Sequence, residues 1–158
     1  MRPSASESPR RLTRGPIDVA ALVREVATVD HGGVCTFVGT ARRTSDGKEV
    51  DLLRYDGYAA MAEKAIEEIV SEAMAKHPGS RVTAVHRLGT CPLGEASVAV
   101  VAAAPHRDAA FAACRFAIDA IKSRAPIWKQ EVFKDGTAWV GDPGSFQAAA
   151  RRGGSDEP

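Results

Sequence analysis

Two amphipathic segments, each preceded by a pair of β-rich segments, restrict the folds open to this chain more than any other feature. Residues 61–74 and 107–121 place apolar side chains at helical spacing along one stripe. Such a helix is stable in water mainly when its apolar stripe packs against another layer. The preceding segments are rich in β-branched and aromatic residues, which is typical of strands. The sequence therefore predicts helices packed on a sheet.

The remaining elements complete the order α-β-β-α-β-β-α-β-β. A third helix is expected over residues 19–26, behind a start signal at Asp18. The predicted strands cover residues 34–41, 50–58, 82–88, 96–103, 127–133 and 137–140. Hairpins dominate this order, and we expect residues 50–58 to pair with residues 34–41. The pattern predicts an α+β fold with a mostly antiparallel sheet and three helices.

The two ends of the chain differ from its middle in composition. Residues 1–15 are rich in Arg, Ser and Pro and nearly free of apolar side chains, and residues 141–158 look similar. Such segments bury too little apolar surface to offset the entropy lost on ordering, so we expect a disordered tail and a flexible tail. Residues 16–140 then form one domain, which is long enough for a modest core.

Composition and charge exclude several classes of protein. The 158 residues carry 21 Lys and Arg against 20 Asp and Glu, so no bulk field attracts nucleic acid or a membrane. Three cysteines without Cys-x-x-Cys spacing argue against a disulfide framework and a metal site, and favour a reducing compartment. No apolar run is long enough to span a bilayer or to act as a secretory signal. We expect a cytoplasmic protein with local anion sites.

The segment from Lys122 to Glu131 carries the strongest chemical signal. Pro126 separates a predicted helix from a predicted strand, and a chain reversal there brings Lys122 and Lys129 into one small volume. Two ammonium groups held close repel each other, so one loses its proton more easily, as a base or nucleophile requires. We expect that residue to be Lys129, because its aromatic and aliphatic neighbours on the strand partly desolvate it, while Lys122 crowds its charge. Two other interpretations stay open. Lys122 complements the helix dipole in one, and Lys129 is a surface lysine paired with Glu131 in the other.

Three weaker motifs offer further polar groups. His106 and Arg107 stand at the start of a predicted helix, where unpaired N–H groups and a partial positive charge favour phosphate or carboxylate. We expect both to line the lysine pocket. Arg42 follows a strand in which Gly39 indicates a bulge or a close approach by a ligand. Solvated arginines and an ordinary helix cap are the alternatives. We interpret His86, at another strand end, as a satisfied, half-buried side chain.

Taken in order, these segments resemble the large, catalytic subunit of molybdopterin synthase. The matching pieces are Phe37-x-Gly39-x-x-Arg42, Leu53-x-Tyr55-x-x-Tyr58 followed by Met61-Ala62, His86-Arg87-x-Gly89, His106-Arg107-x-x-Ala110-Phe111-x-Ala113-Cys114, and Lys122-x-Arg124-x-Pro126-Ile127-Trp128-Lys129-x-Glu131. The match covers essentially residues 34–140. Each piece alone is weak, whereas five pieces in this order are specific.

The resemblance implies a hammerhead-like α/β arrangement and a role in molybdenum cofactor biosynthesis. Enzymes of this family convert a cyclic pyranopterin monophosphate into molybdopterin. The sulfur arrives as a thiocarboxylate on the C-terminal Gly-Gly of a small ubiquitin-like carrier, and the large subunits form a homodimer within a heterotetramer. No cofactor or metal is implied. By position, the resemblance implies Lys122 and Lys129 as catalytic residues, and Phe37, Arg42, His106, Arg107 and Glu131 as substrate-binding residues.

Two other functions stay open at this point. One is a sulfurtransferase that carries a persulfide on Cys91, which lies in a predicted turn and is expected to be exposed. Cys35 and Cys114 lie in apolar segments and are interpreted as small core residues. The other is a non-catalytic dimeric adaptor that binds a ubiquitin-like tail. Nucleic-acid binding is not expected, because the basic residues of the first tail are few.

Overall fold

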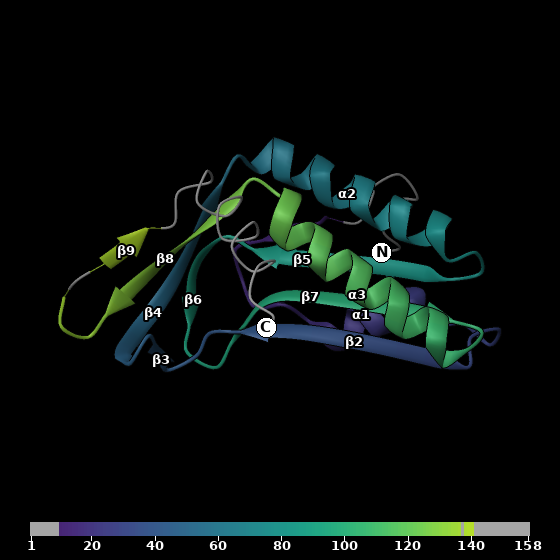
Figure 1. The fold of residues 1–158 in the computed structure, drawn as a ribbon, viewed down its shortest axis with the longest axis horizontal. Coiled ribbons are helices and arrows are strands. Elements are labelled where there is room, and N and C mark those ends of the chain that lie inside the picture. Colours follow the sequence, from purple (N-terminus) through teal and green to yellow (C-terminus); the bar gives the residue numbers. More distant parts are fainter. Residues whose placement is uncertain (1–9, 137, 141–158) are drawn as a thin grey trace, which may run out of the picture.

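Two sheets and three helices make up the computed structural model, which describes residues 10–136 and 138–140 (Figure 1). Most strand pairs are antiparallel, and one short pair is parallel. The predicted α+β fold with three helices is therefore confirmed. The two sheets lie at different ends of the molecule, and the two longer helices run along the first sheet.

The first sheet has the strand order β1-β5-β7-β2. Its strands are β1 (Leu12–Thr13), β5 (Arg81–Arg87), β7 (Ala96–Ala104) and β2 (Gly33–Thr40). Every residue of β7 after the first is buried, and alternate side chains enter two different core clusters. A strand covered on both faces needs a continuous apolar run, and that is what β7 has.

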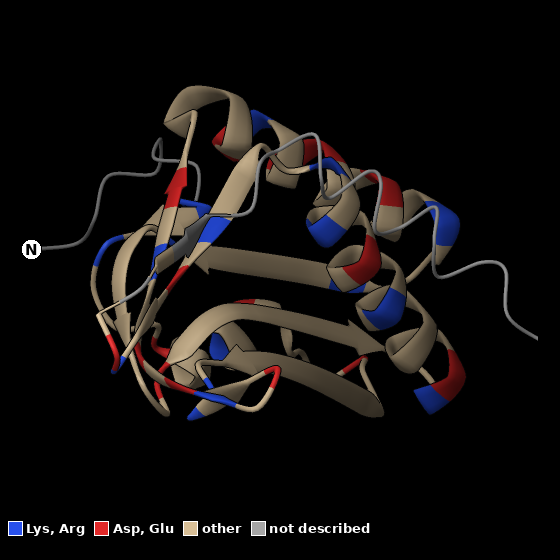
Figure 2. Cartoon of the chain, turned by 60° about the vertical axis from the view of Figure 1, so that its left-hand side comes forward, with Lys and Arg blue, Asp and Glu red and all other residues tan. Residues whose placement is uncertain are grey.

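The helices cover both faces of this sheet. The helices α2 (Ala59–Lys76) and α3 (Arg107–Arg124) pack on one face, and α1 (Val19–Val26) packs on the other (Figure 1). The Asp18 side chain accepts a hydrogen bond from the Ala21 N–H at 3.0 Å, which confirms the predicted helix start. Charges of both signs lie on the helices, while the strands beneath them carry few (Figure 2). No helix of the described residues is long and apolar enough to cross a membrane.

The second sheet has the order β3-β4-β8-β9, and β6 also pairs with β4. Its strands are β3 (Thr44–Ser45), β4 (Lys48–Gly57), β8 (Ile127–Phe133), β9 (Ala138–Val140) and β6 (Gly89–Pro92). The predicted pairing of residues 50–58 with residues 34–41 is wrong. Strand β2 pairs with β7 instead, and β4 pairs with β8, which lies much later in the chain. Periodicity defines a strand, whereas burial in the assembled sheet selects its partner.

The first residues of the described chain show a feature that composition does not reveal. Arg11 is 4% exposed, although the sequence predicts a tail up to residue 15. Its backbone N–H donates to Glu63 at 2.6 Å, its Nε to Glu67 at 2.8 Å and its Nη1 to Thr83 at 2.6 Å. These bonds hold β1 against β5 and α2, because a buried guanidinium needs partners. The tail predictions for residues 1–9 and 141–158 lie outside the described residues.

Candidate active site

A cavity of about 80 Å³ lies where the end of α3 meets the second sheet. Four polar side chains line it, and each comes from a different element: Lys122 from α3, Lys129 from β8, Tyr55 from β4 and His86 from β5. The remaining wall is apolar and consists of Val98, Ile118, Ile121, Ala125 and Ile127. The structure thus brings the two predicted lysines together.

The reversal after α3 is fixed by backbone contacts. Ala125 caps the helix through its N–H, which donates to the Ile121 carbonyl at 3.0 Å, and β8 begins only two residues later. The neighbouring strand β4 passes so close that a Cβ at Gly57 would lie 2.7 Å from the Pro126 carbonyl oxygen. Because only glycine fits this approach, Gly57 helps to hold Lys122 and Lys129 at one cavity.

The two amines have different surroundings. Burial lowers the pKa of Lys122, and the charge of Lys129 lowers it further, although Lys122 as a whole keeps access to solvent. Lys129 Nζ lies 3.2 Å from Glu131 Oε1, and Glu131 is only 9% exposed. Within the described part of the chain, Lys122 has no ion pair. The amine with the lowered pKa is therefore Lys122, and not Lys129 as the sequence led us to expect, because the fold buries the Lys122 amine and pairs Lys129 with Glu131.

His86 and Tyr55 are site residues that the sequence did not predict. His86 is 8% exposed and its Nδ1 lies 2.7 Å from the Arg87 carbonyl oxygen, so the interpretation of a satisfied buried histidine is correct but incomplete. The pKa of His86 is lowered to about 4, mainly by burial. The hydrogen bond to the Arg87 carbonyl raises this pKa, and the charge of Lys122 makes a smaller lowering contribution. Tyr55 lies opposite Lys129 in the pair of strands β4 and β8. This pairing would have identified Tyr55 as a site residue, but it exists only in the folded sheet.

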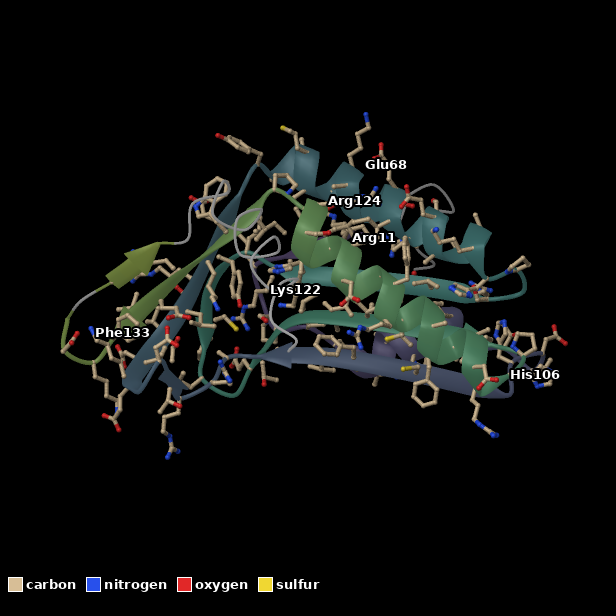
Figure 3. All side chains as sticks on the ribbon, viewed as in Figure 1. Arg11, Glu68, His106, Lys122, Arg124 and Phe133 are labelled. Carbon is tan, nitrogen blue, oxygen red and sulfur yellow. The ribbon has the colours of Figure 1, made fainter. Side chains whose placement is uncertain are left out.

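His106 and Arg107 lie at the opposite end of α3 from Lys122 (Figure 3). Lys122 follows Arg107 by fifteen positions of the helix, which correspond to about 22 Å. His106 is the N-cap residue, but its side chain makes no capping hydrogen bond. The expectation that both residues line the lysine pocket is therefore wrong for a single chain, because one helix separates the two groups.

Arg42 and Phe37 belong to the edge strand β2 and its end. The predicted bulge is present, since the register with β7 shifts between Gly39 and Thr40. Phe37 is 37% exposed, and Arg42 is exposed just beyond the strand. At the other end of β2, a Cβ on Gly33 would lie 3.1 Å from the Cα of Arg107. The strand therefore has one predicted anion-binding group near each of its ends.

Cys91 does not fit a sulfur-carrying role. It lies in β6 with no exposed surface, and burial raises the pKa of its thiol. Its Sγ lies near the carbonyl oxygens of Pro92 and Glu95. The expectation of an exposed turn cysteine is wrong, because the turn residues pair with β4 instead. A buried thiol with a raised pKa is a poor nucleophile.

The fold and the cavity define a class of α+β protein in which two lysines face one small cavity, and the described residues contain no cluster of side chains that could hold a metal ion. Residues 12–124 match the family model described as MoaE protein. The chain belongs to this family.

Similar proteins agree with that assignment. The molybdopterin synthase catalytic subunit of Oryza sativa subsp. indica is 46% identical over 125 residues, which cover 79% of this chain and 65% of that protein. The chain thus spans less than two thirds of that relative. The protein of the same description from Bacillus subtilis (strain 168) is 37% identical, with 83% of each chain covered.

Solved structures show the same fold. The molybdopterin synthase structure from Staphylococcus aureus superposes with a TM-score of 0.80 at 30% identity, covering 84% of this chain and 96% of the other. The molybdopterin biosynthesis MoaE protein from Burkholderia ambifaria MC40-6 gives 0.69 at 37% identity, covering 92% and 97%.

Proposed function

We propose that this chain is the catalytic subunit of a molybdopterin synthase. It transfers sulfur from the C-terminal glycine thiocarboxylate of a small ubiquitin-like partner to cyclic pyranopterin monophosphate and so makes the molybdopterin dithiolene. The descriptions of its relatives support this activity. The single observation that carries the proposal is the cavity shared by Lys122 and Lys129. The proposed location is the cytoplasm, which the three free thiols support.

The two lysines take different parts of the reaction. The thiocarboxylate sulfur forms a bond to a carbon of the pterin substrate while a carbon–oxygen bond at that carbon breaks and the oxygen leaves as water. The bond between the sulfur and the glycine carbonyl carbon then breaks, and the acyl group passes to water or to a lysine amine. Lys122 acts as the base or as the transient acyl acceptor for that carbonyl, because its lowered pKa leaves more of the amine neutral. Lys129, held by Glu131, attracts the anionic thiocarboxylate.

A second copy of the chain completes the site. Among the described residues, β2 is an edge strand of its sheet, and its side chains Val34, Phe37 and Val38 are exposed. Phe111 is also exposed, on the helix α3 that packs against β2. An exposed apolar edge strand favours pairing with another strand. Phe37 then belongs to the contact between copies as well as to the substrate pocket that the family resemblance implies.

Symmetry explains why this edge matters for the chemistry. Two β2 strands related by a two-fold axis run antiparallel, so the Gly33 end of one lies beside the Thr40 end of the other. His106 and Arg107 of the partner subunit would then approach Arg42 and the lysine cavity. Arg42, His106 and Arg107 bind the phosphate and the pterin, and the N-terminus of α3 favours the anion.

The decisive test uses the whole chain with a thiocarboxylated carrier and the cyclic pterin precursor. Mass spectrometry should detect a product that has gained two sulfurs. A carrier that binds while the pterin mass stays unchanged would show a non-catalytic adaptor and overturn the proposal. Cys91→Ser should leave the yield unchanged, whereas loss of transfer in that variant would favour the persulfide route.

A further inference from the structure

Two polar groups of the lysine cavity, His86 and Tyr55, have no part in the function proposed above. His86 reaches the cavity from β5, a strand of the first sheet, while Lys129 and Tyr55 come from the second sheet. Its imidazole is buried, and it carries chemistry that an aliphatic side chain at this position would not.

The tautomer of His86 follows from its backbone partner. The Arg87 carbonyl oxygen can only accept a hydrogen bond, so Nδ1, 2.7 Å away, carries the proton. With a pKa of about 4, the ring is neutral at physiological pH. Nε2 then bears a lone pair, and no described residue donates a hydrogen bond to it. The cavity thus contains a fixed, neutral acceptor.

The ring is also held in place. Tyr55 packs against it edge to face, with ring centroids 5.0 Å apart and an interplanar angle of 73°. Tyr55 is itself fixed by its place opposite Lys129 in the sheet and by an interaction of its hydroxyl with Ser97. A histidine with a defined tautomer and a packed face presents its free nitrogen in one direction.

We propose that His86 is a positioning residue, whose Nε2 accepts a hydrogen bond from the Lys122 amine and directs that amine toward the reacting group. Both side chains line the same small cavity, so the bond needs only rotation within the flexible lysine stem. One N–H of the amine binds Nε2, and the nitrogen lone pair is left for the substrate. The role in catalysis rests on the proposed function, whereas the bond itself does not.

The surroundings of Lys122 determine the sign of the expected pH effect. The titratable groups that share its cavity are His86 from β5, Tyr55 from β4 and Lys129 from β8, and Lys129 is in turn paired with Glu131. A neutral acceptor stabilises the ammonium form more than the amine. Removing it should therefore lower the pKa of Lys122 further.

The first experiment measures that pKa without any enzymatic assay. Titration of Lys122 by NMR should give a lower pKa in His86→Phe than in the wild type, and His86→Gln, which keeps an acceptor, should recover part of the shift. His77→Phe, at the C-cap of α2, serves as the matched control. An unchanged Lys122 pKa in a folded His86→Phe protein would overturn the proposal. If that variant does not fold, a wild-type His86 protonated on Nε2 at pH 7 would overturn it equally.

The second experiment follows sulfur transfer. In His86→Phe, kcat should fall by about 10- to 100-fold with KM nearly unchanged, because a misdirected amine affects the chemical step. The acid limb of the rate profile should move to lower pH, which a purely structural role would not produce. If the wild type transfers no sulfur, the proposed function fails, and the NMR titration still decides the role of His86.

Discussion

The two ends of α3 are built on different principles. At its C-terminal end, five elements close around a small cavity, which contains the buried His86 and a lysine, Lys129, that is paired with Glu131. At its N-terminal end, His106 and Arg107 are exposed, and the histidine makes no capping bond (Figure 3). One chain supplies every residue that lines the cavity at the first end, whereas the groups at the second end are exposed. Under the proposed function, the groups that carry out the chemistry come from one chain, whereas the groups that bind the substrate come from both copies of the dimer.

The largest expected effect comes from removing a lysine at the closed end of α3, which is the C-terminal end with the cavity of Lys122 and Lys129. Lys122→Ala and Lys129→Ala should each lower turnover by about a thousandfold, because each removes a group that acts on the thiocarboxylate or its carbonyl. Steady-state assays of pterin conversion would measure this. Lys64→Ala, a surface lysine of α2 near Glu68, is the control and should retain the wild-type rate. Near-normal turnover in Lys129→Ala would remove the lysine mechanism.

The next effect concerns the stability of the closed end. The pKa of His86 is about 4 in the folded protein against an ordinary 6.5, so the unfolded chain binds a proton that the native protein does not between these values. The stabilisation is present above pH 6.5 and is lost as pH falls toward 4, by about 3 kcal/mol. Denaturation at pH 7 and pH 4.5 should show the loss. His86→Phe should remove this part of the pH dependence, and a variant with the wild-type dependence would contradict the burial argument.

A complementation experiment compares the two ends directly. Arg107→Ala alone should weaken substrate binding by about 1.5–3 kcal/mol. Mixed with Lys122→Ala protein under conditions that exchange subunits, it should regain activity, because one site of the mixed dimer then contains both intact residues. If both residues served the same chain, every site in the mixture would carry a defect. Absence of recovery after verified exchange would place the two ends in one chain's site.

The smallest expected effect tests how the closed end is held. Gly57→Ala puts a methyl group 2.7 Å from the Pro126 carbonyl and should cost at least about 1 kcal/mol of unfolding free energy. Gly15→Ala, where a Cβ meets no atom within 4 Å, is the control. Urea denaturation would compare them. Equal free energies of unfolding for the two variants would show that the close approach of Gly57 to Pro126 does not constrain the residue at position 57.

Some features of the site could be predicted from the sequence, and others could not. The lysines flank a proline between a helix and a strand, so a local reversal sufficed to predict their proximity. His86 looked ordinary because its importance depends on β5 lying beside α3. Cys91 looked exposed because its turn sequence does not reveal that β4 pairs with it. Local signals travel a few residues, whereas these contacts join segments far apart in the chain.

The sequence by itself determined the three helices, the nature of the α+β fold and the meeting of Lys122 with Lys129. These depend on spacing and turn chemistry, which act over one or two turns of helix. The tertiary structure alone decided which strands pair, that Tyr55 and His86 enter the cavity, and that a whole helix separates His106 from Lys122. Burial and strand pairing are collective properties, and they have values only once distant segments share a core.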